Sequence, residues 1–304
     1  MPESNHAYGR RTLLRAAGLA PLLAAAACAD QAQAQAPGAR PRVEDRSFTT
    51  SDGVHLHYLD AGRGRTILFV PGWSMPAFIW DPQIASLSSR YRTVAMDPRG
   101  QGRSDIARSG YEPTRRGRDI AEMISRLGSE RVVLVGWSLG VLDSLAWLQA
   151  NGDRQLAGLV LVDNSVGEGT PPPARPPTFI PNLRRQREQT LRGFVRGMYT
   201  SEQDPAYLDA VTRAALRTPL EAQVQLLSYP RPREYWRDAV YSTRRPVLYA
   251  VRPRFAGQAE LLQRNHANAT IAIFERAGHA LFVDEADRFN TLLDDFCSTK
   301  ARWT

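Results

Sequence analysis

Lysine is nearly absent from this chain. Lys300 is the only lysine among the 39 Lys and Arg residues, so arginine supplies almost all of the positive charge behind the formal net charge of +8. The arginines are scattered along the 304 residues, and no recognisable nucleic-acid-binding module accompanies them. We therefore expect a basic, solvated surface and no nucleic-acid partner.

Long hydrophobic runs are also lacking. The most apolar stretch, residues 16–27, is too short to span a membrane comfortably. It follows the pair Arg10-Arg11 and precedes the small-residue sequence Ala32-Gln33-Ala34, which is typical of a signal cleavage site. We predict that residues 1–36 are a twin-arginine export signal and linker, which makes the periplasm the expected location. A disordered tail is the alternative.

Cysteine is scarce. Cys28 and Cys297 are the only two, and removal of the export segment would leave Cys297 alone. A single cysteine forms no internal disulfide, so stability has to come from a hydrophobic core. The residues before Cys28 weakly resemble a lipoprotein signal, which leaves lipidation at Cys28, and anchoring to a membrane through it, as a second possibility.

The rest of the chain, residues 37–304, alternates buried apolar runs with amphipathic stretches and contains no internal repeat. Continuous β-branched runs are typical of strands buried on both faces of a parallel sheet. The predicted strands are residues 66–70, 91–96, 131–135, 156–162, 246–251 and 270–274, and the predicted helices are residues 81–89, 114–127, 139–149 and 257–266. This order predicts one α/β domain with a doubly wound, mostly parallel sheet.

One segment departs from the alternation. Residues 165–245 are too long for a simple connection, and they contain helical patterns at 188–198 and 205–216. Long connections in compact domains usually have a function. We predict a helical cap above the ends of the strands.

The strongest motif is Gly136-Trp137-Ser138-Leu139-Gly140, a G-x-S-x-G at a predicted strand-to-helix turn. A serine at such a turn is exposed above the sheet, and the close approach of strand and helix requires glycine at both ends of the motif. We predict that Ser138 is a nucleophile. The alternative is a turn with a helix-capping serine.

A serine hydroxyl needs a base. His279 follows the last predicted strand and opens the final helix, a place from which its imidazole can reach Ser138. His55 and His57 share an early strand without a third metal ligand, and His266 ends a helix, where we expect it on the solvent side. His279 is therefore the candidate base, and we expect no metal site.

Together these motifs resemble the α/β-hydrolase superfamily, in particular its esterases and its cofactor-free haloperoxidases. The likeness rests on residues 70–73 (Val-Pro-Gly-Trp), on residues 97–104 (Asp-Pro-Arg-Gly-Gln-Gly-Arg-Ser), on the Ser138 motif and on Ala277-Gly278-His279. It covers residues 46–298 apart from the cap. The resemblance implies no cofactor, and it implies structural roles for Asp97 and Arg99.

The same resemblance implies an oxyanion hole made by the backbone amides of Trp73 and Leu139. Two donors that converge on the developing oxyanion are usually the largest single catalytic contribution. In the family a histidine more often precedes this glycine, where the chain has Pro71. The Trp73 and Trp137 side chains would line an apolar acyl pocket, with core packing as the alternative.

The third member of the triad departs from the usual pattern. Relatives commonly carry an acid after the strand that follows the cap, but residues 247–257 contain no carboxylate. Some relatives carry it one strand earlier, where this chain has Asp163. An ionised Asp163 would orient His279 and stabilise its protonated form. Glu260 is the reserve candidate.

The sequence therefore predicts a serine hydrolase that cleaves small to medium carboxylic esters through an acyl-enzyme. Perhydrolysis and the hydrolysis of lactones, amides or C–C bonds would use the same residues. A ligand receptor that has lost turnover is a further alternative. This alternative gains support if Asp163 does not face His279.

Overall fold

The computed structural model describes residues 42–173 and 176–304. The predicted export signal, its cleavage site and Cys28 lie outside the described residues, so they stay predictions. None of the described helices is long and apolar enough to cross a membrane.

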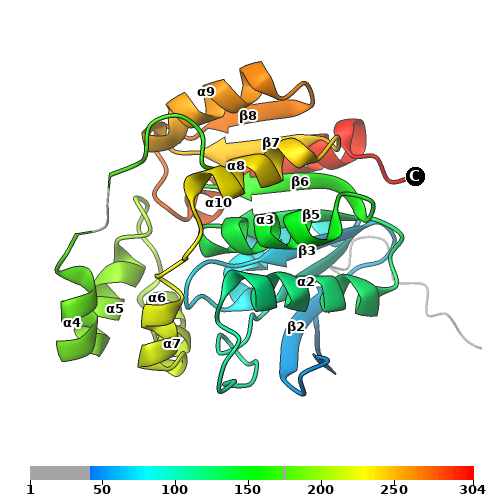
Figure 1. Ribbon diagram of the computed structural model, residues 1–304. Helices are drawn as coiled ribbons and strands as arrows, with labels where there is room; N and C mark the ends of the chain where they lie inside the picture. The colour runs from blue at the N-terminus through cyan, green and yellow to red at the C-terminus, as the bar shows by residue number, and fades with distance from the viewer. Residues whose placement is uncertain (1–41, 174–175) are drawn as a thin grey trace, which may run out of the picture. The chain divides into compact units, whose positions relative to one another are not determined.

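An eight-stranded sheet forms the centre of the described domain (Figure 1). Its spatial order is β1-β2-β4-β3-β5-β6-β7-β8, and all neighbours are parallel except the pairs that include β2. The strands are β1 (Glu44–Thr49), β2 (His55–Ala61), β3 (Thr66–Val70), β4 (Arg92–Met96), β5 (Val132–Trp137), β6 (Leu156–Val162), β7 (Val247–Val251) and β8 (Ala269–Ile273). The predicted mostly parallel α/β sheet is confirmed.

Helices cover both faces of the sheet because successive strand side chains point to opposite sides. Leu68 and Val70 of β3 pack into one core, and Ile67 and Phe69 pack into the other. The first core lies against α2 (Pro113–Leu127), α3 (Leu139–Asn151), α8 (Arg233–Ser242) and α9 (Ala256–Asn265). The second lies against η1 (Ala77–Trp80), α1 (Asp81–Leu87), α10 (Leu281–Asp284), α11 (Ala286–Asp295) and η3 (Phe296–Lys300).

Four helices of the predicted cap region stand beyond the ends of the strands (Figure 1). They are α4 (Phe179–Arg185), α5 (Arg187–Arg196), α6 (Pro205–Arg217) and α7 (Leu220–Gln225). The next helix, α8, lies within the range predicted for the cap but packs against α3 beside the sheet. The apolar residues Trp236, Ala239 and Val240 explain this position, because they face the sheet core.

Candidate active site

Ser138 occupies a sharp turn between β5 and α3. Its backbone has φ 54° and ψ −118°, a conformation that side-chain-bearing residues rarely adopt. The turn is held because the Ser138 amide donates to the carbonyl of Val162 at the end of β6. Asn164 adds a second restraint, since its side-chain amide donates to the Ser138 carbonyl at 2.7 Å. Backbone strain of this kind persists only where the surroundings enforce it, and it clusters at functional sites.

The glycines of the motif permit the close packing that this turn requires. A Cβ atom at Gly136 would overlap the Gly140 carbonyl oxygen, and a Cβ at Gly140 would overlap the carbonyl oxygen of Val70. On the opposite side, a Cβ at Gly72 would come within 3.0 Å of the Ser138 Cβ. The reason for glycine at positions 136 and 140 is therefore steric, as the motif predicted.

We expect Gly136→Ala to destabilise the protein strongly. The new methyl would meet backbone atoms that cannot rotate away, so the strand and the helix must move apart, at a cost of several kcal/mol. Gly193→Ala is the matched control, because that helical glycine has open space around its Cβ position. The control should gain about 0.5–1 kcal/mol. Thermal unfolding measures both, and equal melting temperatures for the two variants would contradict the steric account.

His279 and Asp163 complete a hydrogen-bonded chain with Ser138. The His279 Nε2 atom lies 2.8 Å from the Ser138 Oγ, and its Nδ1 lies 2.6 Å from the Asp163 Oδ2. The three residues come from the end of β5, the end of β6 and the loop after β8. The structure thus brings together the three residues that the sequence nominated, and Asp163 faces His279.

Asp163 is held in an unusual backbone conformation and is almost completely buried. Its φ is 49°, and it is 1% exposed. Burial alone would raise the pKa of its carboxyl group, but the hydrogen bond and the charge of His279, together with Arg252, hold that pKa below its ordinary value. The carboxylate is therefore ionised at neutral pH, which is the state that orients an imidazole and stabilises its protonated form.

Glu260, the reserve candidate, does not approach the site. It lies exposed on α9, where its nearest ionic partner is Arg264 one helical turn away.

The amides of Trp73 and Leu139 remain available near Ser138. Within the part of the chain that the structure describes, neither amide donates to a protein acceptor. Leu139 is the first residue of α3, where an amide has no partner within the helix. Trp73 directly follows Gly72, which packs against Ser138. The two amides are therefore candidates to bind an anion that forms at Ser138, as the resemblance implied.

Helix α7 of the cap region supports the loop that carries Trp73. The Trp73 indole donates to the Gln223 carbonyl at 2.8 Å, and the Gln223 side-chain amide lies 3.2 Å from the Ser74 Oγ. Ser74 has φ 59°, and both polar side chains are fully buried. From the main domain, the Gln101 side chain donates to the carbonyls of Gly72 and Met75. The loop is thus held between the cap and the main domain.

The loop of His279 is likewise tied to the cap region. Asp284 accepts from the Gly278 amide and also from the amides and hydroxyls of Thr200 and Ser201. The Ala280 amide donates to the carbonyl of Met198 at 3.0 Å. These contacts restrict movement of His279 and make its position depend on the segment between α5 and α6.

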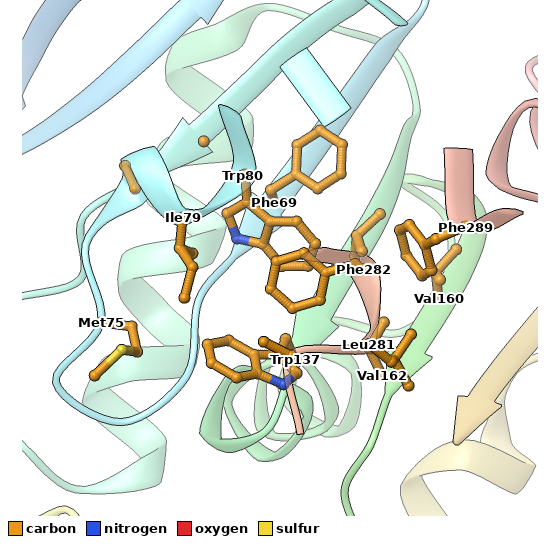
Figure 2. Close-up of a cluster of buried hydrophobic side chains, with 14 of the residues drawn as sticks. Phe69, Met75, Ile79, Trp80, Trp137, Val160, Val162, Leu281, Phe282 and Phe289 are labelled. Carbon is orange, nitrogen blue, oxygen red and sulfur yellow. The ribbon is translucent and has the colours of Figure 1, made fainter. Parts of the chain in front are cut away.

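The two tryptophans predicted to line a pocket are both buried. Trp137 is 1% exposed, its ring packs against His279 and Phe282, and its indole donates to the His279 carbonyl at 2.8 Å. Figure 2 shows it among the buried side chains beside Phe282. It supports His279 from the core. Trp73 is 4% exposed and meets Phe179 and Phe194 of the cap region edge-on. A direct contact of either ring with substrate stays a prediction.

The remaining histidines in the described residues have structural partners. His57 is buried between Asp97 and Asp45, and His55 bonds Asp105 at the surface. The prediction that His266 lies on the solvent side is wrong: it is 6% exposed and its Nε2 donates to the Thr243 carbonyl at 3.0 Å. The described residues contain no group of three or more His, Cys, Asp or Glu side chains placed to hold a metal ion.

Asp97 and Arg99 hold loops together, as expected. The Asp97 carboxylate accepts from the amides of Ala77 and Arg103, and Arg99 forms a buried ion pair with Asp119.

Sequence reasoning missed Arg252, Gln223 and Asp284. Each acts through contacts with residues that are distant in the chain, so no local motif marks it. Only Arg252 had a signal, because it lies in the stretch after β7 where an acid was sought and an arginine was found.

A family comparison decides the classification. The model described as "Alpha/beta hydrolase family" matches residues 67–292. The chain belongs to the alpha/beta hydrolase family. The resemblance drawn from the motifs is thereby confirmed, as is the fold class.

Individual relatives of this alpha/beta hydrolase are distant. A non-heme haloperoxidase from Rhodococcus erythropolis is 36% identical over 115 residues, which is 38% of this chain and only 42% of that relative. A pimeloyl-(acyl-carrier protein) methyl ester esterase from Nitrosomonas europaea is 26% identical over 256 residues, covering 79% of this chain and 98% of the relative. Among solved structures, an esterase from Exiguobacterium antarcticum is 22% identical with a TM-score of 0.74, covering 84% of this chain and all of the other. This last likeness shows the fold.

Proposed function

We propose that this alpha/beta hydrolase is a serine hydrolase that cleaves carboxylic esters through an acyl-enzyme. The observation that carries the proposal is the continuous hydrogen-bonded chain from Ser138 Oγ through His279 to Asp163, with contacts of 2.8 and 2.6 Å. A serine is activated as a nucleophile when its hydroxyl contacts a base that a third group orients. The amides of Trp73 and Leu139, which have no acceptor among the described residues, supply the second requirement of acyl transfer.

In the proposed reaction, the Ser138 oxygen attacks the ester carbonyl carbon while His279 Nε2 takes the hydroxyl proton. The resulting oxyanion accepts hydrogen bonds from the amides of Trp73 and Leu139. As the tetrahedral intermediate collapses, His279 returns the proton to the departing alkoxide, which leaves as an alcohol. His279 then takes a proton from water while the water oxygen attacks the acyl-enzyme carbonyl. As this second tetrahedral intermediate collapses, His279 gives the proton to the departing Ser138 oxygen, and the carboxylic acid is released.

The substrate proposed is a small to medium ester with an apolar acyl part. Two observations support this choice. The ring cluster of Trp73, Phe179 and Phe194 brings apolar surface to the loop that adjoins Ser138. The names of two relatives, the methyl ester esterase and the esterase of known structure, indicate the same reaction type for those proteins.

Labelling with a fluorophosphonate tests this proposal. Purified protein should react stoichiometrically, mass spectrometry should place the adduct on Ser138, and the Ser138→Ala variant should not react. A panel of p-nitrophenyl esters with increasing acyl length then tests the substrate class, with the highest kcat/KM expected for short and medium chains. Folded protein that neither labels nor turns over any ester would disprove the proposal and favour a ligand receptor.

Perhydrolysis is a second candidate, because a relative at 36% identity over part of its length is a haloperoxidase. Here hydrogen peroxide replaces water in the attack on the acyl-enzyme and a peracid is released. The amount of peracid that forms from an ester in the presence of hydrogen peroxide measures this second activity. The receptor alternative would have gained support if Asp163 did not face His279, but the two side chains are 2.6 Å apart.

A further inference from the structure

Arg252 directly follows β7 and binds the carboxylate of Asp163. Its backbone amide donates to Asp163 Oδ1 at 3.0 Å, and its Nε donates to Oδ2 at 2.6 Å. That same Oδ2 accepts from His279 Nδ1. The Arg252 Nη2 comes within 3.4 Å of this Nδ1, so the cation contacts both members of the pair.

This arrangement has electrostatic consequences because the site is partly shielded from water. The Asp163 side chain is fully buried, and the side chains of Arg252 and His279 are 24% and 20% exposed. Two groups thus compete for one carboxylate. Asp163 favours a positive charge on His279, while the fixed charge of Arg252 disfavours it.

Few other titratable groups face this pair. From β7, the Tyr249 hydroxyl is directed to the Asn164 carbonyl at 2.7 Å, and burial holds its pKa well above the ordinary value, so it stays neutral. From α10, Asp284 is engaged with Gly278 and the cap region. From β5, Trp137 contributes an uncharged ring. Among the described residues, the charge balance around His279 is therefore set mainly by Asp163 and Arg252.

We propose that Arg252 is a positioning residue for the reaction at Ser138, with two effects. It fixes the rotation of the Asp163 carboxylate so that Oδ2 points at His279, and its charge sets the lowest pH at which His279 is free to accept the Ser138 proton. This inference rests on the proposed serine hydrolase function. It explains why a stretch without a carboxylate can follow β7: the acid comes from β6, and β7 supplies its counter-ion.

Kinetics as a function of pH test the proposal, with p-nitrophenyl butyrate as substrate in a pH-stat. Arg252→Met keeps much of the side-chain volume but removes the charge. Its kcat should fall about 10–100-fold through lost orientation, with KM nearly unchanged. The midpoint of the acidic limb of kcat/KM should rise by about one pH unit, because Asp163 then stabilises the imidazolium unopposed. Arg252→Lys keeps the charge without the planar fork, so its midpoint should stay near the wild-type value while kcat falls.

Arg92→Met is the matched control. Arg92 is also 24% exposed and pairs with a nearly buried carboxylate, Asp60. This pair joins β4 to β2, which lie on the other side of β3 from β5 and Ser138. The Arg92→Met substitution should lower the melting temperature without shifting the pH profile of kcat/KM. If Arg252→Met does not fold, Arg252→Gln replaces it, and we expect the same rise in the midpoint of the acidic limb.

The outcomes separate this inference from the function on which it rests. Wild-type protein without labelling or turnover would overturn both. An active wild type whose neutral Arg252 variants are folded, slower and unshifted in pH profile would overturn the electrostatic role alone. Unchanged kcat together with an unchanged midpoint would overturn the positioning role as well.

Discussion

Ser138→Ala is expected to lower kcat/KM for p-nitrophenyl esters by about 10⁴–10⁶-fold, while the fold and the melting temperature stay near those of the wild type. Removal of a triad nucleophile leaves only catalysis by substrate binding and the oxyanion hole, which amounts to about 10³–10⁴-fold over water. Among the described residues, the Ser138 hydroxyl forms a hydrogen bond only with His279, so loss of the hydroxyl costs little stability. Alanine does not relieve the backbone strain, because φ 54° is unfavourable for any residue with a Cβ.

Ser144→Ala is the matched control for this loss. Ser144 is fully buried on α3, one turn from the motif, and its hydroxyl donates to the Gly140 carbonyl at 2.7 Å. Its removal should cost about 1 kcal/mol of stability and leave ester turnover within a few-fold of the wild type. Activity that survives in Ser138→Ala but is lost in Ser144→Ala would place the nucleophile elsewhere.

Asp163→Asn is expected to lower kcat by about 10³–10⁴-fold with a small change in KM. An amide at this position can present its NH₂ group to His279 Nδ1, which turns the imidazole into the wrong tautomer and removes the charge that stabilises its protonated form. Labelling of Ser138 by a fluorophosphonate should slow in parallel, because it depends on the same activated hydroxyl. The partner Arg252 would then lack its carboxylate, which adds a loss of stability.

The pH dependence of stability gives this prediction a second measurement. The pKa of Asp163 is lowered by folding, so its contribution to stability is present above the ordinary aspartate range and is lost as the pH falls through the lowered pKa. The difference in melting temperature between the wild type and Asp163→Asn should therefore be largest near neutral pH and should narrow in acid. A difference that widens in acid would contradict the ionised, His279-bound carboxylate.

Asp143→Asn controls for the loss of a buried ion pair as such. Asp143 is 1% exposed on α3 and pairs with Arg116, and the Tyr229 hydroxyl also donates to it. Breaking this pair should cost about 3–5 kcal/mol, because Arg116 would remain buried without its partner. It should change kcat much less than Asp163→Asn does. Equal losses of kcat in the two variants would mean that Asp163 acts through stability alone.

Much of the sheet, and the nucleophile and base of the site, followed from local patterns. The six predicted strands all formed, with ends that differ by at most two residues, because continuous apolar runs bounded by turns leave few alternatives. Ser138 could be nominated since the glycines at 136 and 140 and the strand-to-helix context encode the turn within a few residues. His279 could be nominated by its place after the last strand.

The errors arose where burial depends on distant partners. His266 was expected in solvent because it ends an amphipathic helix, yet in the interior the Thr243 carbonyl, 23 residues earlier, accepts a hydrogen bond from its ring. Likewise, the packing of α8 against α3 could not be derived from the long segment between β6 and β7, because its apolar face matches a surface made by another part of the chain.

By itself, the sequence determined the alternation of strands and helices, the strained serine turn and the histidine loop, because each is encoded by neighbouring residues. Only the tertiary structure decided which carboxylate faces His279, that Arg252 shares this carboxylate, and that Gln223 and Asp284 tie the site to the cap region. The physical reason is that these contacts join residues from 83 to 150 positions apart. They depend on the order of strands in the sheet and on the packing of helices above it, which local sequence does not encode.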